Sequence, residues 1–310
     1  MKRFQVVIGI VKNSSGQLLL SRRPNGKHLS GYWEFPGGKV ESSESFKQAL
    51  RRELKEEIAI DVGAVKTKLN YEYQYPDRLL HLQVFEVISY SNDVCALEGQ
   101  ELKWFSESSI NNLQVPPANY SIMNAIRLPD FYMIACQSVY KNGLFPAVKA
   151  QLLEGISIIQ FRAPNLTKPE YTSRAKELRD LCEEYNAKFI SNCDLAWIDE
   201  IQPHGIHLTS ARLREVSNEN VGTEFFSASC HDQNEIELAN QLRTSCVIIA
   251  PVQYTHSHPN NSSLGWNKFR QLCGVSNCPV YAMGGLGKSD LLNAKVCGAQ
   301  GVAGIRLFQN

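Results

Sequence analysis

Three glutamates with helical spacing are the residues of this chain whose chemistry is easiest to interpret. Glu53, Glu56 and Glu57 stand at positions i, i+3 and i+4 of a stretch with helical periodicity, so one helix face would carry all three carboxylates. Like charges at this spacing repel each other, and a cation between them removes the repulsion. Carboxylate oxygens are the ligands that Mg²⁺ prefers, and Mn²⁺ accepts the same ligands. We therefore expect a Mg²⁺ site on this helix, with Mn²⁺ as an acceptable substitute.

The alternative is a solvated acidic helix face that pairs with Arg51, Arg52 and Lys55. The wider pattern favours the metal, because residues 38–60 resemble the Nudix box, Gly-x5-Glu-x7-Arg-Glu-aliphatic-x-Glu-Glu-x-Gly-aliphatic, with Ala59 in place of the second Gly. The resemblance implies hydrolysis of a nucleoside diphosphate linked to another moiety, with Arg52 as the anchor of the carboxylates. Ala59 puts the local loop geometry in doubt, not the metal site.

The resemblance extends over residues 1–128 and is strongest to the MutT-type Nudix hydrolases, the 8-oxo-dGTP diphosphatases. It rests on the phrases SRR (21–23), EFPGGK (34–39), YPDR (75–78) and PPAN (116–119). It implies that Arg23 contacts the nucleotide and that Asn119 reads the oxidised guanine. The other residues to which it assigns a role are His28, Glu34 and Arg78 in the nucleotide pocket, and Glu98 and the carbonyl of Gly37 at the metal.

Some of these assignments have structural alternatives. An Asn amide donates and accepts hydrogen bonds at once, which suits a guanine that presents O6 and a protonated N7. Asn119 could instead cap the helix that follows it. Arg23 and Arg78 could simply form surface ion pairs, and either Glu53 or Glu98 could be the general base.

The elements before Pro129 predict an α+β domain with the Nudix fold, a mixed sheet between helices. Residues 3–13 and 18–23 indicate a hairpin around a turn at 13–16, and helical spacing runs from Ser45 to Ile58. Two further strands are expected at 71–75 and 79–89. Because proline disfavours helix in the residue before it, Leu128-Pro129 ends the last helix, and we place the domains at 1–129 and 130–310.

The second domain alternates short apolar runs with amphipathic stretches, as βα units do. Eight such runs predict a (β/α)₈ barrel, and they read FYMIAC, ISIIQFR, KFIS, GIHL, FFSASC, CVIIAPV, PVYAMGG and GVAGI. The sequence reaches only RLFQN after the eighth run, so we expect the last helix to be truncated. An uncovered strand exposes apolar surface, which predicts that the barrel packs on the Nudix domain or on another subunit.

Residues 131–310 resemble the thiamine-phosphate synthase and TenI group through the phrases QFRAPN, SNCD, GIHL, SASCH, AMGG and GVAGI. The resemblance implies that Gln160 and Arg162 bind a pyrimidine diphosphate. Two lysines of the synthases are missing, one of them at Pro164, and the TenI catalytic histidine is replaced by Pro251. A leaving pyrophosphate needs such cations, so neither chemistry is well supported.

A ligand site in the barrel has a few further candidates. Gly284, Gly285 and Gly304 follow strands seven and eight, where barrels commonly bind phosphate through backbone N–H groups, although they could equally serve tight turns. Asp194 could hold Mg²⁺ or cap a helix. The histidines at 204, 207, 256 and 258 lack the spacing of a zinc site and are expected to be hydrogen-bonded structural residues.

Composition excludes several classes of protein. The chain has 310 residues, 43% hydrophobic and 20% charged, and a net charge of +1, which is typical of a globular protein and argues against binding a nucleic-acid polymer. No apolar run is long enough for a membrane span, so we expect a cytoplasmic protein. The nine cysteines form no CxxC pair and are expected to be reduced structural thiols.

Together these patterns predict a Mg²⁺-dependent hydrolase that converts 8-oxo-dGTP to 8-oxo-dGMP and pyrophosphate, which removes a mutagenic nucleotide before DNA replication and so complements DNA repair. Its expected partner is a free nucleoside triphosphate. The barrel is expected to bind a phosphorylated ligand or to be structural. The alternative is a Nudix pyrophosphohydrolase that acts on thiamine-related diphosphates together with the barrel.

Overall fold

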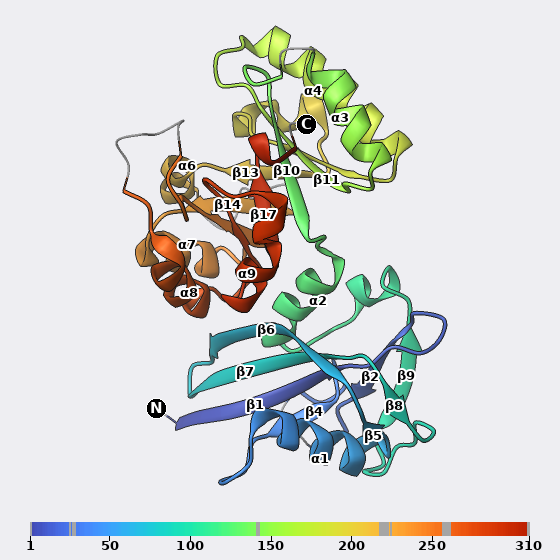
Figure 1. The fold of residues 1–310 in the computed structure, drawn as a ribbon. Coiled ribbons are helices and arrows are strands. Elements are labelled where there is room, and N and C mark those ends of the chain that lie inside the picture. The colour runs from blue at the N-terminus through green and yellow to red at the C-terminus, as the bar shows by residue number, and fades with distance from the viewer. Residues whose placement is uncertain are drawn as a thin grey trace. The chain divides into compact units, whose positions relative to one another are not determined.

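The computed structural model divides the chain into two compact units, Met1–Arg127 and Leu128–Asn310 (Figure 1). The structure describes residues 2–24, 26, 29–140, 143–216, 223, 225–255 and 262–308. No helix among these residues is long and apolar enough to cross a membrane. All nine cysteines are free, and all except Cys95 are buried, as expected for reduced structural thiols.

The first unit is built on a mixed sheet that lies between two helices. The sheet has the order β4-β1-β7-β6, with β1 antiparallel to β4 and parallel to β7. Alternate residues of β1 enter two cores, because Val7 packs with helix α1 and Ile8 packs with helix α2. This confirms the predicted Nudix fold. The elements are β1 (Lys2–Ile10), β4 (Gly37–Lys39), α1 (Phe46–Ile58), β6 (Val65–Gln74), β7 (Arg78–Val87) and α2 (Tyr120–Arg127).

The predicted hairpin is a turn that joins two different sheets. The turn exists, since the Asn13 side chain accepts hydrogen bonds from the backbone N–H groups of Ser15 and Gln17. However, β1 stays in the mixed sheet, whereas β2 (Leu18–Arg22) pairs with β3 (Trp33–Glu34) and β9 (Glu101–Phe105). The connection between them is the isolated bridge of Lys12 with Leu18. A separate pair is formed by β5 (Asp61–Val62) and β8 (Tyr90–Ser91).

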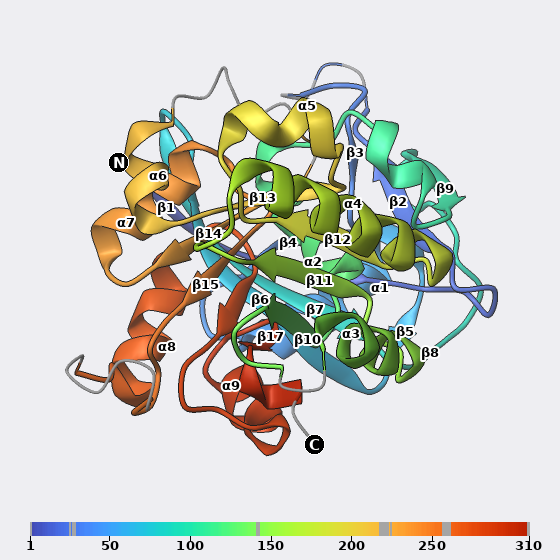
Figure 2. The same cartoon turned by 90° about the horizontal axis from the view of Figure 1, so that it is seen from above.

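The second unit is a closed barrel of eight parallel strands with helices around it, as predicted (Figure 2). Each expected apolar run contains one strand. The strands are β10 (Phe131–Cys136), β11 (Ile158–Arg162), β12 (Lys188–Ser191), β13 (Gly205–Leu208), β14 (Phe226–Cys230), β15 (Cys246–Ile249), β16 (Val280–Ala282) and β17 (Gly301–Gly304). The helices are α3 (Leu144–Leu153), α4 (Lys168–Glu184), α5 (Ile198–Ile201), α6 (Ser210–Glu215), α7 (Gln233–Gln241), α8 (Gly265–Val275) and α9 (Leu291–Val296).

The residues at the start of the second unit are bonded to the barrel. Leu128 belongs to the apolar cluster of the barrel interior, together with Tyr132 and Tyr281. The Tyr281 hydroxyl donates to the Pro129 carbonyl at 2.6 Å, and the Gln300 amide donates to the carbonyl of Leu128 at 2.5 Å. These bonds fix the chain where it enters β10.

After β17 the described chain forms a 3₁₀ turn, Arg306–Phe308. Phe308 is buried, and its ring lies 6.4 Å from the ring of Phe131 in an edge-on arrangement. Truncation of the last helix stays a prediction. Packing of the barrel on the first unit or on a second chain stays a prediction.

Candidate active site

Helix α1 begins at a capping box that fixes its first turn. The backbone N–H of Ser45 donates to the Gln48 side chain at 2.9 Å, and the Ser45 hydroxyl accepts from the Gln48 N–H at 3.4 Å. The buried face of the helix carries Leu50 and Leu54. The acidic residues share one face beside this buried one, as their spacing predicted, and Glu53 and Glu57 are themselves partly buried.

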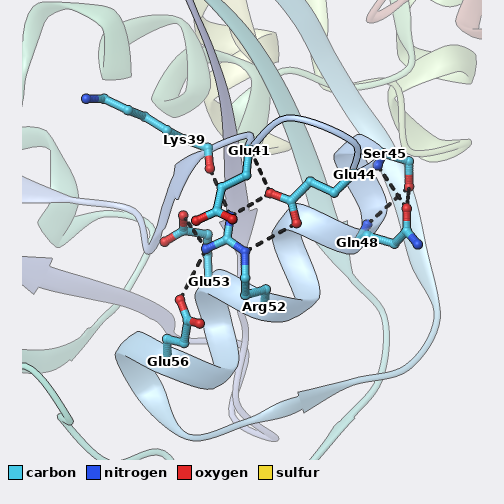
Figure 3. Close-up of polar contacts among 8 residues, drawn as sticks. All are labelled: Lys39, Glu41, Glu44, Ser45, Gln48, Arg52, Glu53 and Glu56. Atoms are coloured by element: carbon cyan, nitrogen blue, oxygen red, sulfur yellow. Dashed lines mark hydrogen bonds and ion pairs between the residues drawn. The ribbon is translucent and has the colours of Figure 1, made fainter.

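Arg52 is the centre of the polar network on this face (Figure 3). Its guanidinium donates to both oxygens of Glu44, at 2.6 and 3.2 Å, and to Glu53 and Glu56 at 2.9 and 3.1 Å. A further hydrogen bond of 3.0 Å reaches the Lys39 carbonyl. The bond from Arg52 lowers the pKa of Glu44, and the bond to Glu44 raises the pKa of Arg52. Arg52 thus ties the strand-to-helix loop to the helix, as an anchor would.

Glu53 lies in a confined place between α1 and β4. Its side chain is only 15% exposed, and burial raises the pKa of its carboxyl although the ion pair with Arg52 opposes this. A Cβ atom on Gly38 would overlap the Glu53 carboxylate. A residue without a side chain at position 38 is therefore required for this placement.

Glu57 is joined to the same strand from the other end of the acidic face. Its carboxylate accepts a hydrogen bond from the backbone N–H of Gly37 at 3.0 Å. Burial, and after it the charges of Glu53, Glu98 and Glu34, raise the pKa of Glu57 to about 7, although the bond from Gly37 opposes the rise. The carboxylates of these four glutamates therefore lie close enough to repel one another around Glu57.

Glu98 belongs to a loop that is held by the C-terminal end of α1. The Glu57 carbonyl accepts from the Leu97 N–H at 3.1 Å and from the Gln100 side chain at 2.8 Å. The Glu98 side chain is exposed, so it is free to approach a ligand on this face. The structure thus brings the loop carboxylate to the helix, although the two are distant in sequence.

The donor set fits a hard divalent cation by its chemistry. Gly37, Glu53, Glu56, Glu57 and Glu98 supply only oxygen atoms, and the excess negative charge around Glu57 is of the kind that a cation relieves. Within the described residues, however, no three acidic, His or Cys side chains converge closely enough to hold a metal ion. Glu56 bonds to Arg52 instead. A metal could therefore be held here only after side chains had rearranged.

The predicted nucleotide residues are partly paired with one another. Arg23 donates to Glu34 at 2.7 Å, and both side chains are 29% exposed. Arg78 pairs with its neighbour Asp77 at 2.6 Å, so the surface ion pair that we considered for it is present. His28 lies outside the described residues.

Asn119 is buried at the start of α2. It ends a 3₁₀ turn, Pro117–Asn119, and the residue is only 5% exposed. Its Nδ2 atom is buried and has no hydrogen-bond partner among the described residues. A buried amide donor without a partner is costly, which points to a ligand that accepts its hydrogen bond.

In the barrel, Gln160 and Arg162 lie on β11, and Gln160 is 1% exposed with a buried Oε1 that has no partner in the described part of the chain. Asp194 accepts from the Ala196 N–H at 3.0 Å and caps a 3₁₀ turn, which is the structural role that we considered for it.

The barrel glycines are used for close packing. Gly284 and Gly285 have φ values of 101° and 69°, and a Cβ on either would overlap the segment 251–255. A Cβ on Gly304 would come within 2.9 Å of Leu307. The positive φ values of Gly284 and Gly285 agree with the tight turns that we considered for them, Gly304 is a position of close packing, and phosphate binding stays a prediction.

Two barrel histidines are hydrogen-bonded as expected of structural residues. His207 bonds to the hydroxyls of Ser227 and Ser229, both at 2.8 Å, and burial lowers its pKa to about 3. His204 accepts from the Phe189 N–H at 3.1 Å. His256 and His258 lie outside the described residues.

The sequence did not single out several residues that shape the site. Glu44, 16% exposed, is the shortest-distance partner of Arg52, and its place in the Nudix box, eight residues before Arg52, is a signal that could have found it. Gly38, which allows the close approach of Glu53, is the first glycine of the same box, whereas the sequence carries no signal for the long-range hydrogen bond of Gln100.

Comparisons with known proteins agree with this division of the chain. Residues 7–125 match the model of the NUDIX domain family, and residues 131–308 match the model of the thiamine monophosphate synthase family. The 8-oxo-dGTP diphosphatase of Escherichia coli K12 is 33% identical over 127 residues, which are 41% of this chain and 98% of that protein.

Two further relatives have names that give other activities. The CTP pyrophosphohydrolase of Escherichia coli K12 is 34% identical over 125 residues, 40% of this chain and 92% of that protein. The thiamine-phosphate synthase of Clostridium perfringens strain 13 is 25% identical over 184 residues, 58% of this chain and 87% of that protein.

Proposed function

Because the chain belongs to the Nudix family through its first unit and to the thiamine monophosphate synthase family through its second, we propose that it is a Nudix hydrolase of 8-oxo-dGTP with a fused, non-synthase barrel. The reaction would cleave the triphosphate to 8-oxo-dGMP and pyrophosphate. We assign it to residues 1–129 and the ligand-binding or structural role to residues 130–310, in a cytoplasmic protein.

The acidic face of α1 would carry the chemistry. Gly37, Glu53, Glu56, Glu57 and Glu98 would hold Mg²⁺, or Mn²⁺ in its place. The bound metal would neutralise phosphate oxygens and lower the pKa of a water molecule. Glu53 or Glu98 would accept the proton of the attacking water, and Arg52 would keep the carboxylates in place through its bonds to both ends of the loop.

The nucleotide would lie against the residues that the first unit gathers near Asn119. Arg23 and Arg78 would contact the phosphates or sugar, with Glu34 orienting Arg23 through their 2.7 Å ion pair. His28 would complete the pocket. Asn119 would donate to O6 of the oxidised guanine and accept from its N7–H.

The unpartnered amide of Asn119 is the observation that carries this proposal. An Asn that served only the fold would be expected to bond within the protein, since nearly all buried polar groups do. The Nδ2 atom has no partner in the described residues, so it can donate a hydrogen bond to a ligand. Its position in PPAN, together with the relative that is named an 8-oxo-dGTP diphosphatase, supports guanine as that acceptor.

A substrate panel with Mg²⁺ tests the proposal on the whole protein. We expect kcat/KM to be highest for 8-oxo-dGTP, lower for dGTP and CTP, and lowest for thiamine diphosphate. Glu53→Gln should lower turnover by about 10³-fold, the scale of losing a positioned catalytic group. Glu101→Gln, the same chemical change at an exposed ion pair, serves as the control. Unchanged turnover in Glu53→Gln, or a preference for CTP, would overturn the proposal.

A second candidate is hydrolysis of a thiamine-related diphosphate. It is favoured by the fusion with a barrel of the thiamine monophosphate synthase family. The same panel decides, because this candidate requires thiamine diphosphate to be the best substrate.

The barrel itself is proposed to bind a phosphorylated ligand without synthase activity, or to be structural. Support comes from Pro164 at the position of a synthase lysine, and from Asp194, whose carboxylate caps a turn. Gln160, Arg162 and the glycines 284, 285 and 304 would line such a ligand site. Formation of thiamine phosphate by the whole protein would refute this assignment.

A further inference from the structure

A tyrosine of the central sheet is hydrogen-bonded to the residue next to Asn119. The Tyr71 hydroxyl, from the middle of β6, donates to the Ala118 carbonyl at 2.6 Å, and the two residues are 47 positions apart. Tyr71 is 3% exposed and packs in one core with Ala118, Ile122 and Met123. This bond therefore links the sheet directly to the peptide that precedes the Asn119 side chain.

The bond holds at every working pH. Burial raises the pKa of Tyr71 well above its ordinary value, so the hydroxyl stays protonated and remains a donor. A buried hydroxyl that lost its acceptor would be strongly disfavoured, which keeps the two residues together.

A second tyrosine lies close to the same backbone. Tyr75 is partly buried and packs in the same core as Ala118; burial raises the pKa of its hydroxyl, and the Ala118 backbone opposes this rise. The charges of Arg23 and Arg78 also lower the pKa of Tyr75, so its hydroxyl lies near both predicted nucleotide-binding arginines.

Asn119 needs such a support. Its own N–H donates to the Pro116 carbonyl at 2.8 Å inside a 3₁₀ turn, and its Nδ2 has no partner in the described part of the chain. No protein acceptor among the described residues therefore orients the side-chain amide before a base arrives, so the direction of the amide depends on the backbone. Reading a base by paired hydrogen bonds tolerates errors of only a fraction of an ångström.

We propose that Tyr71 is a positioning residue for base discrimination, which fixes the Ala118–Asn119 peptide and thereby aims the Asn119 amide, with Tyr75 supporting the same peptide. The inference rests on the proposed hydrolysis of 8-oxo-dGTP. It adds a specificity-determining residue that lies inside the core and does not touch the nucleotide.

Tyr71→Phe tests it, because this change removes one hydroxyl and keeps the ring. The measured quantity is the ratio of kcat/KM for 8-oxo-dGTP to that for dGTP. We expect the ratio to fall about tenfold, since small displacements of a positioned group carry costs of this order or larger. Urea unfolding reports whether the variant stays folded. If it does not, Tyr75→Phe replaces it, with a smaller fall expected.

A double-mutant cycle separates positioning from a general loss of structure. In the Asn119→Ala background, Tyr71→Phe should leave the ratio unchanged within about twofold, because the group that it positions is gone. An equal fall in both backgrounds overturns the inference, as does a wild-type preference that survives in Tyr71→Phe and Tyr75→Phe. A wild-type protein without preference for 8-oxo-dGTP overturns the proposed function, and this inference with it.

Discussion

The Glu57 carboxylate accepts a hydrogen bond from the backbone N–H of Gly37 at 3.0 Å, and this bond closes the acidic face of α1 against strand β4. The bond alone does not offset the burial of the charge, since the pKa of Glu57 is raised to about 7. Glu57 is thus held in a place where its ionised form is costly. That arrangement favours the binding of a cation over the stability of the free protein.

Replacement of Glu57 by Gln is expected to stabilise the metal-free protein. A carboxyl whose pKa rises from 4.5 to about 7 on folding destabilises the fold. The destabilisation is complete above pH 7, decreases as the pH falls from 7 to 4.5 and is absent below 4.5. Glu57→Gln keeps an acceptor for the Gly37 N–H. It should raise the free energy of unfolding of the first unit by about 2 kcal/mol at pH 8 in EDTA, and by nothing below pH 4.5.

Urea unfolding at several pH values measures this difference, with Glu101→Gln as the exposed control that should stay within about 0.5 kcal/mol of the wild type. A Glu57→Gln protein that is less stable at pH 8 would contradict the interpretation. Activity should be lost in the same variant, so that stability and turnover change in opposite directions.

Arg52→Lys should lower kcat/KM about 100-fold while the protein stays folded. A lysine keeps the charge but cannot reach Glu44, Glu53 and the Lys39 carbonyl at once, as the planar guanidinium does. The carboxylates would then move by distances that cost activity on this scale. Arg51→Lys is the matched control, because the Arg51 guanidinium donates to the backbone carbonyls of Val62 and Gly63. Similar losses in both variants would refute the anchoring role.

Ala59→Gly should stabilise the first unit by about 1 kcal/mol. Ala59 ends α1 with a φ of 65°, in the left-handed region that favours glycine, and its N–H donates to the Lys55 carbonyl at 3.2 Å. The departure from the Nudix box thus retains the loop geometry at a conformational cost. Ala64→Gly, at a residue without positive φ, should destabilise by about 0.5 kcal/mol through the entropy of the unfolded chain. Thermal unfolding compares the two, and a loss of stability in both would count against this account.

Local patterns predicted the elements of this protein well. The helix at 45–58 has strong periodicity, the eight barrel strands are short apolar runs, and Ser45 is the cap where helical spacing begins. The turn of the hairpin at 3–23 was predicted, but the pattern could not show that its two strands continue into different sheets, because alternation of apolar residues marks a strand and does not identify its neighbour.

The site was predictable as far as it is encoded by one helix. The spacing of Glu53, Glu56 and Glu57 put them on one face, but it could not decide whether they pair with Arg52, as Glu53 and Glu56 do. The contacts around Asn119 could not be predicted from the sequence for a different reason. The bond between Tyr71 and Ala118 spans 47 positions, and no short-range pattern encodes a contact at that distance.

The stability of the barrel should decrease steeply below pH 6.5 because of His207. Its pKa is lowered from 6.5 to about 3, first by burial and then by the charge of Arg162. Between pH 6.5 and 3 the histidine is protonated in the unfolded chain but not in the folded barrel. The contribution of His207 to the free energy of unfolding is therefore complete above pH 6.5 and is lost as the pH falls towards 3. The loss is about 1.4 kcal/mol per pH unit, or about 2 kcal/mol between pH 6.5 and 5.

The variant His207→Gln tests this prediction, because it removes the titrating group. Calorimetric scans of its barrel transition should show a flatter pH dependence, although the variant loses a bond to Ser227 or Ser229. His81→Gln, in the first unit, should leave the dependence of the barrel unchanged. An identical pH slope in wild type and His207→Gln would show that the histidine is protonated in the folded barrel.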